Sequence, residues 1–255
     1  MPNPVITTSG LILKEMDYRE NDTLITILTK DLGVVFARAR GAKRSRSHIA
    51  APTGLFAYSN LTLYRSKDKF TLDSADSIDL FFGLHSDILK LSLAAYICEL
   101  CSIFSPELEP AEQHLRLALN TLHLLEKDKR PPLLLKAIFE LRLTAISGFM
   151  PDLSACAVCM EKTEGNMLFS PGEGTLICPE CASGARRRDD IPLSAAAVAA
   201  MRHVVNSPAD KVFNFTLSGD AQRQFCSVCE RNLLYYAERP PASLNFLTSV
   251  LAGID

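Results

Sequence analysis

Residues 5–39 decide how the chain begins to fold, and they read VITTSGLILKEMDYRENDTLITILTKDLGVVFARA. Alternating or apolar runs are separated by turn residues at Asn21-Asp22 and at 31–33, which is the pattern of β-strands. Because the pattern continues to about Ser77, we expect five strands, at residues 9–15, 23–29, 34–39, 55–64 and 70–75. Five short strands suit a small closed barrel, since closure removes the exposed edges of a sheet. The sequence therefore predicts a five-stranded OB-fold barrel.

After Ser77 the apolar residues recur every three or four positions, which is the helical period. The third expected helix should end at Gly148, a suitable residue for a left-handed C-terminal position. The fold class is therefore α+β, with a barrel domain at residues 1–80 and an α-helical domain at 81–255. The expected helices cover residues 84–104, 110–125, 132–147, 194–206, 220–238 and 243–251, and a cysteine-rich insert occupies about 152–183.

The composition is that of a soluble globular protein, with 47% hydrophobic and 22% charged residues in 255. Apolar runs stay below the roughly 18 residues needed to cross a bilayer, so no membrane segment is expected. The start, Met1-Pro2-Asn3-Pro4, lacks the basic and apolar regions of a signal peptide. We therefore expect a cytoplasmic protein whose thiols are reduced.

All eight cysteines fall in C-x-x-C pairs, and the two middle pairs have the spacing of a structural zinc site. Eighteen residues separate these pairs, and they include a predicted hairpin at 167–177. None of the five histidines lies in this segment, so a site of four cysteines is expected. Such a site has no open position for chemistry. The sequence predicts one structural Zn²⁺, bound by Cys156, Cys159, Cys178 and Cys181.

The pairs Cys98/Cys101 and Cys226/Cys229 lie within predicted helices. At this spacing two sulfurs share one helix face, and free cysteine packs as a small buried hydrophobe. A second zinc site or a redox pair is the alternative. A thioredoxin-like pair, however, stands at a helix N-terminus after a strand, and neither pair has that setting.

Basic residues gather near the N-terminus although the net charge is −2. Residues 1–70 hold 11 Lys or Arg against 6 Asp or Glu, whereas residues 71–130 hold 5 against 10. A solvated loop is the ordinary interpretation of such a cluster, but its place at a strand end of a small barrel favours phosphate binding. The residues expected to contact DNA are Arg38, Arg40, Lys43, Arg44, Arg46, Arg65 and Lys67.

Two further features bear on this interface. Aromatic residues that could stack on bases are sparse near the basic cluster, and the candidates are Phe36, Phe56, Tyr58 and Tyr64. Most of them are expected to pack in the barrel, which favours backbone contact over base reading. The run Arg186-Arg187-Arg188 is a second basic patch, balanced by the two aspartates that follow it. We expect it to be ordinary surface.

Several segments resemble, in order and spacing, the bacterial RecO family. They are residues 10–13, 18–22, 29–33, 40–44, 96–100, 139–143 and 148–153, together with the cysteine cluster. The resemblance implies a protein that binds single- and double-stranded DNA and anneals complementary strands. It also implies action with RecR to help RecA load onto DNA coated by single-stranded DNA-binding protein, in the cytoplasm and at the nucleoid.

The resemblance also assigns residues. It places DNA binding on the barrel's basic loop and zinc on the four cysteines. It implies that the acidic C-terminal tail of single-stranded DNA-binding protein is recognised near 139–143, where Lys136, Phe139 and Arg142 are candidates. Met160 departs from the family, which often has glycine after the first C-x-x-C pair.

No phosphate-binding P-loop and no H-E-x-x-H motif occurs in the sequence, so no catalytic centre is expected. Two rival functions stay open. One is a thiol–disulfide enzyme that uses a C-x-x-C pair, and the other is an RNA- or transcription-associated zinc-ribbon adaptor.

Overall fold

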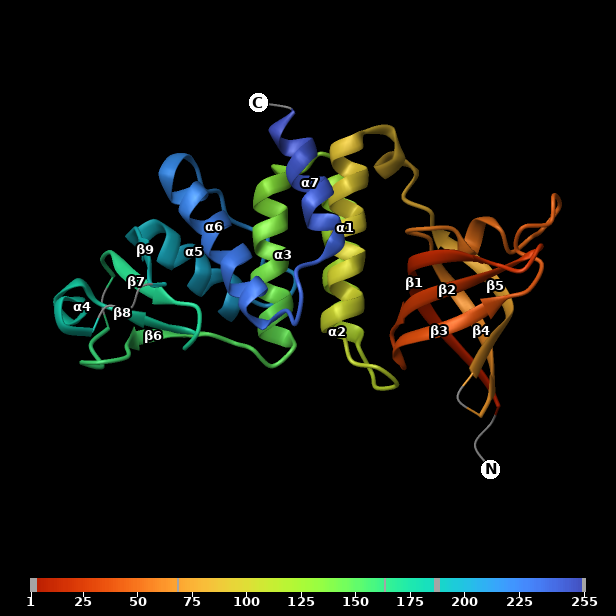
Figure 1. Cartoon of the computed structure of the whole chain (residues 1–255), viewed down its shortest axis with the longest axis horizontal. Helices are drawn as coiled ribbons and strands as arrows, with labels where there is room; N and C mark the ends of the chain where they lie inside the picture. Colours follow the sequence, from red (N-terminus) through yellow and green to blue (C-terminus); the bar gives the residue numbers. More distant parts are fainter. Residues whose placement is uncertain (1–3, 68, 163, 186–188, 254–255) are drawn as a thin grey trace. The chain divides into compact units, whose positions relative to one another are not determined.

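The computed structural model describes residues 4–67, 69–162, 164–185 and 189–253. Its contacts divide the chain into two compact units, of which the first comprises Met1–Lys129 with Pro241–Asp255 and the second Arg130–Pro240. The barrel belongs to the first unit and the cysteine-rich insert to the second (Figure 1). The run 186–188 lies outside the described residues. Among the helices that are described, none is long and apolar enough to cross a membrane.

The N-terminal strands close into a barrel in the order β1-β2-β3-β5-β4, which confirms the OB-fold barrel. Alternation sends Ile25, Ile27, Val35 and Ala37 into its core. A short 3-10 helix, η1 (Ala51–Thr53), lies between the third and fourth strands. The strands are β1 (Val5–Tyr18), β2 (Asp22–Thr29), β3 (Gly33–Ala39), β4 (Tyr58–Ser66) and β5 (Lys69–Asp79).

Strand β1 is twice as long as expected because it serves two neighbours. Its first half pairs with β4 and its second half with β2, and a bulge between Ile12 and Lys14 shifts the register of the β1–β2 pairing. A bulge bends a strand, which allows β1 to turn a corner of the barrel. The second half of β1 therefore extends, with β2, into a hairpin at one end of the barrel.

Three helices complete the first unit: α1 (Ile88–Phe104), α2 (Glu112–Glu126) and α7 (Ala242–Ala252). The sequence predicted a helix from residue 84, but Asp87 is extended and its carboxylate accepts hydrogen bonds from the amides of Leu89 and Lys90. This cap starts α1 at residue 88 and separates it from the 3-10 helix η2 (Phe82–Ser86). Glu99 of α1 accepts hydrogen bonds from the first amides of α7, which attaches the C-terminal helix to α1.

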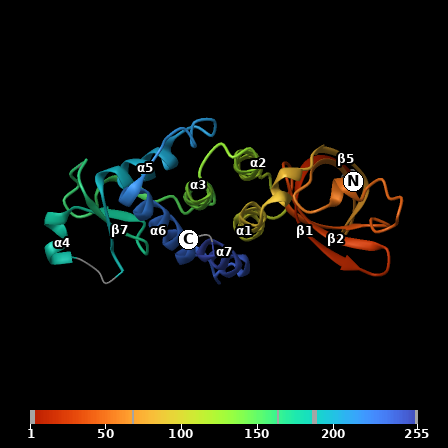
Figure 2. The ribbon, with the colours of Figure 1, turned by 90° about the horizontal axis from the view of Figure 1, so that it is seen from above.

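In the second unit α3 (Pro132–Ile146) packs against α5 (Ala195–Asn206) and α6 (Gly219–Tyr236) (Figure 2). Gly148 follows α3 with φ +96°, as expected of a helix-ending glycine. The predicted hairpin at 167–177 is confirmed, and it is part of a four-stranded sheet of order β6-β8-β7-β9. These strands are β6 (Asp152–Cys156), β7 (Met167–Ser170), β8 (Thr175–Ile177) and β9 (Ile191–Leu193), and α4 (Pro179–Ala185) follows β8.

Candidate functional site

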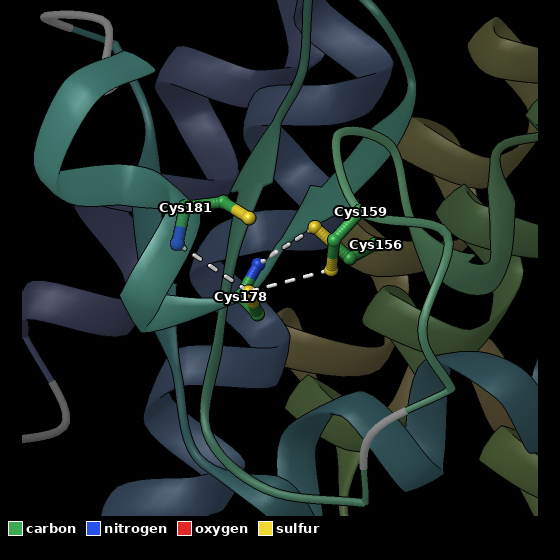
Figure 3. Close-up of side chains that lie close together, drawn as sticks. All are labelled: Cys156, Cys159, Cys178 and Cys181. Atoms are coloured by element: carbon green, nitrogen blue, oxygen red, sulfur yellow. Dashed lines mark hydrogen bonds between the residues drawn. The ribbon is translucent and has the colours of Figure 1, made fainter.

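The four middle cysteines converge from the ends of short elements. Parallel pairing of β6 with β8 places Cys156 beside Leu176, so the chain segments that follow the two strands lie together. Cys178 follows β8 directly and Cys181 lies in α4. All four Sγ atoms lie within 4.8 Å of one another, and Figure 3 shows their side chains turned toward a common centre. The structure thus brings together the residues that the spacing predicted.

The geometry of the cluster fits a tetrahedral metal ion. With zinc–sulfur bonds of about 2.3 Å, sulfurs at adjacent corners of a tetrahedron lie about 3.8 Å apart. The sulfurs of Cys159 and Cys178 are 3.9 Å apart. The Cys178 amide donates to the Cys156 sulfur at 3.3 Å, and the Cys181 amide donates to the Cys178 sulfur at 3.5 Å. Amides aimed at sulfur favour the thiolate, which is the form that binds metal.

The pKa of Cys156 reflects both the burial of its thiol and the amides that point at its sulfur. Burial of the thiol raises the pKa, but the amides of Cys159, Cys178 and Val158 outweigh burial and bring it to about 6. The neighbouring Cys178 thiol and burial raise the pKa of Cys181 to about 12 at the same time, as expected when several thiols share one small site and cannot all ionise without a cation between them.

Met160 adopts the conformation that glycine would adopt more easily. Its φ is +63°, and its amide donates to the Cys156 carbonyl at 2.9 Å to close the turn. A left-handed residue with a side chain costs about 1–2 kcal/mol. The turn around the first cysteine pair therefore forms without glycine, at a cost that metal binding can offset.

The other two cysteine pairs pack in helices, as predicted. Cys98, Cys101 and Cys229 are buried, and burial raises the pKa of Cys101 to about 12 and the pKa values of the other two well above the ordinary thiol value. A thiol that stays protonated is a poor nucleophile. Burial also raises the pKa of the half-buried Cys226 to about 11, so the pairs in α1 and α6 lack the low thiol pKa of a thioredoxin-like site.

The basic segment, residues 40–46, follows β3 and is exposed at its four cationic side chains: Arg40, Lys43, Arg44 and Arg46. Gly41 has φ +69°, which permits the chain to turn sharply as it leaves the strand. Successive turns follow, in which the amide of Arg44 donates to the Gly41 carbonyl and that of Ser47 donates to the Arg44 carbonyl. The cations therefore project from an ordered series of turns.

Asp22 holds the start of this segment. One carboxylate oxygen accepts the Gly41 amide at 2.8 Å, and the other accepts Nε of Arg38 at 2.8 Å and its Nη2. The Gly41 amide and the Arg38 guanidinium hold the pKa of Asp22 below its ordinary value. Arg38, predicted to contact DNA, is half-buried in this ion pair and lies over the Tyr18 ring. Its charge is therefore partly neutralised by its own chain.

The remaining cations lie at two places along β3. Lys43 pairs with Asp17 at 2.6 Å, and its amide donates to the carbonyl of Asn21, so the segment rests on the β1–β2 hairpin. Arg65, near the end of β4, and Lys67, in the turn that follows it, are both exposed. Parallel pairing of β5 with β3 starts next to this turn. The basic segment thus follows the end of β3, whereas the β4–β5 turn lies near the strand's middle.

The aromatic residues near the basic segment differ in their exposure to solvent. Phe56 is fully buried, as expected, whereas Tyr64 and Phe36 leave 47% and 61% of their surface exposed. Phe36 alternates with Val35 and Ala37, which fill the core, so it must point outward. The expectation that most of these rings pack inside is therefore wrong for Phe36 and Tyr64.

We predict that Asp22→Ala loosens the basic segment. The Gly41 amide loses a charged acceptor, and its hydrogen exchange is expected to become about tenfold faster or more. In the unaltered protein this protection is present at neutral pH and is lost as the pH falls through the lowered pKa of Asp22. Asp17→Ala is the control, because an exposed ion pair contributes little. Equal exchange rates in the two variants would show that Asp22 is not the anchor.

The predicted partner residues on α3 are engaged by their own chain. Lys136 is buried and donates to Glu140 and Glu230, both at 2.6 Å. Phe139 is completely buried, and Arg142 donates to the carbonyls of Val204 and Val205 near the end of α5. The carboxylates that accept hydrogen bonds from Lys136 therefore belong to this chain. Recognition of an acidic tail by these three residues stays a prediction, and their packing gives it no support.

Fold and site together define an OB-fold protein with an exposed basic segment on its barrel. Its helical part carries four cysteines whose sulfurs are arranged as in a metal site. Comparison with known proteins gives the family. The family model for the recombination protein O N terminal matches residues 1–81, and that for the recombination protein O C terminal matches residues 85–245. This chain belongs to the RecO family.

Two relatives named DNA repair protein RecO match nearly the whole chain. The DNA repair protein RecO of Acetivibrio thermocellus is 31% identical over 245 residues, which cover 96% of this chain and 97% of that protein. That of Symbiobacterium thermophilum is also 31% identical, over 248 residues that cover 94% of this chain and 96% of the relative. The match therefore includes both the barrel and the helical part.

Proposed function

We propose that this chain is a non-catalytic recombination mediator in DNA repair. In this proposal residues 1–80 bind single- and double-stranded DNA through the barrel, and residues 81–255 form the α-helical domain that carries the cysteine insert and the surface for the tail of single-stranded DNA-binding protein. The protein anneals complementary strands and, with RecR, helps RecA load onto DNA coated by single-stranded DNA-binding protein. It acts in the cytoplasm, associated with the nucleoid when it is bound to DNA.

The observation that supports this proposal most directly is the basic segment on the barrel. Its four exposed cations project from a backbone fixed by Asp22 and Asn21. Each phosphate that such a cation neutralises releases counterions, which gives salt-sensitive affinity without sequence preference. A fixed backbone reduces the ordering cost of binding.

Annealing needs no bond chemistry. Two complementary strands repel each other through their phosphates, and a protein that neutralises part of this charge lowers the barrier to their encounter. Exposed cations lie at two places along β3, so they can contact two stretches of DNA phosphate backbone. This reasoning supports a binding protein over an enzyme.

We propose that the four cysteines hold one structural Zn²⁺. Four thiolates complete a tetrahedral shell, so the ion would crosslink β6, β8 and α4 and would leave no position for a substrate. The strands of this sheet contain three to five residues each, so their ladders supply few hydrogen bonds. The metal would supply the missing stability.

Strand annealing tests the function. Complementary strands carrying a fluorophore and a quencher are each coated with single-stranded DNA-binding protein, and the protein is then added. We expect faster quenching than with coated strands alone, and competition by unlabelled DNA in preference to RNA. An unchanged annealing rate across a range of salt concentrations would contradict the proposal, and preference for RNA would favour an RNA-associated adaptor.

A further inference from the structure

Phe36 stands exposed in the middle of β3, although the face to which it belongs is covered elsewhere. Two neighbours on the same outer face, Leu28 and Val34, are buried. Helix α1 contacts β2, and the Val34 amide donates to the carbonyl of Pro106. Further along the strand this cover ends, and 61% of Phe36 is open to solvent. The barrel therefore presents a flat aromatic ring on an uncovered part of its wall.

Cations lie on both sides of this ring. Arg38 and Arg40 follow Phe36 at alternate positions of one strand face, and Arg40 is about 13 Å away at 3.3 Å per residue. On the other side, Ala37 pairs with Phe70, so the residue before each, Phe36 and Lys69, are neighbours beside the β4–β5 turn. Phe36 thus lies between the basic segment and the basic turn.

The β1–β2 hairpin, next to Phe36, carries a cation on the outer face and its carboxylates on the opposite face. Lys14 pairs with Thr26, and Thr26 pairs with Phe36, so these three side chains share the outer face. Glu15 and Asp17, one position out of phase, line a cavity of about 440 Å³ on the other side of the hairpin with Thr23 and Ala42. Alternation along β1 therefore keeps its carboxylates away from the ring.

We propose that Phe36 is a stacking platform for an unpaired base of single-stranded DNA. The DNA strand crosses β3, with its phosphates on the cations at 40–46 and on Arg65, Lys67 and Lys69, and with one base on the ring. A base in a duplex is already stacked on both faces, so an aromatic platform selects single strands, whereas cations alone bind either form. This inference rests on DNA binding by the barrel and adds the preference for single strands.

The test compares Phe36→Leu with Phe82→Leu. Phe82 is 73% exposed and lies in η2, outside the barrel strands, so it controls for loss of an exposed ring. Binding is measured by fluorescence anisotropy with a labelled oligothymidylate and with a duplex of equal length. Phe36→Leu is expected to weaken single-strand binding about 5- to 150-fold and to leave duplex binding unchanged. Phe36→Trp should restore single-strand binding, and Phe82→Leu should behave as the unaltered protein.

Each other outcome overturns the inference in a distinguishable way. If Phe36→Leu binds single strands as tightly as the unaltered protein does, Phe36 is not a stacking platform. Duplex binding by the same variant would still support the proposed function. An equal loss for both probes would mean that the ring supports the fold and does not stack on a base. If the unaltered protein binds neither probe, the proposed function fails and the platform fails with it.

Discussion

Replacing Cys178 with serine is expected to release the metal and unfold the sheet around it. Cys178 is buried, lies 3.9 Å from the Cys159 sulfur and donates its amide to the Cys156 sulfur, so it contacts both halves of the cluster. Structural zinc contributes on the order of 10 kcal/mol to the folding of a small metal-binding unit. Strands of three to five residues form few ladder hydrogen bonds, so we expect the sheet to depend on that contribution.

The measurement is zinc content per chain, together with hydrogen exchange over residues 152–185. The unaltered protein should hold one zinc and protect β7 and β8, and Cys178→Ser should lose both properties. Chelation should reproduce the loss, more readily at acid pH because protons compete for thiolates. Cys226→Ser is the matched control, a cysteine of a C-x-x-C pair within α6. Full zinc content in Cys178→Ser, or loss of zinc in Cys226→Ser, would contradict a four-thiol site.

The barrel could be predicted because strand alternation is a local signal. Residues of β2 and β3 alternate between core and surface, so their period shows in the sequence. The full length of β1 could not be predicted, because it depends on the pairing of one strand with two partners. The same holds for β6 and β9, which are too short to show a period and exist through their pairing with β8 and β7.

The cysteine cluster was predictable for a different reason. Ligand spacing is chemical information that survives without knowledge of the fold, and the four sulfurs do converge. Asp22 carries no such signal. A carboxylate in a turn is common, and only the approach of Gly41 and Arg38 shows what it anchors. Phe36 did carry a signal, because its alternation with Val35 and Ala37 places it outside the barrel.

Residues on α3 show where resemblance and packing diverge. A lysine and an arginine on a predicted helix suggested a surface for an acidic partner. The structure buries that face of α3 against α6, where Glu230 meets Lys136, and against the end of α5. Whether a helix face is exposed depends on elements almost a hundred residues away, which no local pattern reveals.

Reversing the charge of Lys43, Arg44 and Arg46 together is expected to weaken binding to both single- and double-stranded DNA by about 100-fold or more at low salt. The three side chains are exposed and the backbone beneath them is held by Asp22 and Asn21, so the fold should tolerate the change. A glutamate at 43 would face Asp17, and Lys43→Gln in the same triple variant separates that repulsion from the loss of a phosphate contact.

Salt dependence is the decisive measurement. Loss of three phosphate contacts should reduce the slope of log K against log salt by about two to three. The control carries the same change in net charge at Lys211, Arg231 and Arg239, exposed cations of the second unit. If this control flattened the slope equally, the effect would be one of overall charge. A flattened slope in the basic-segment variant alone, for both forms of DNA, would assign the phosphate contacts to residues 40–46 and leave strand preference to Phe36.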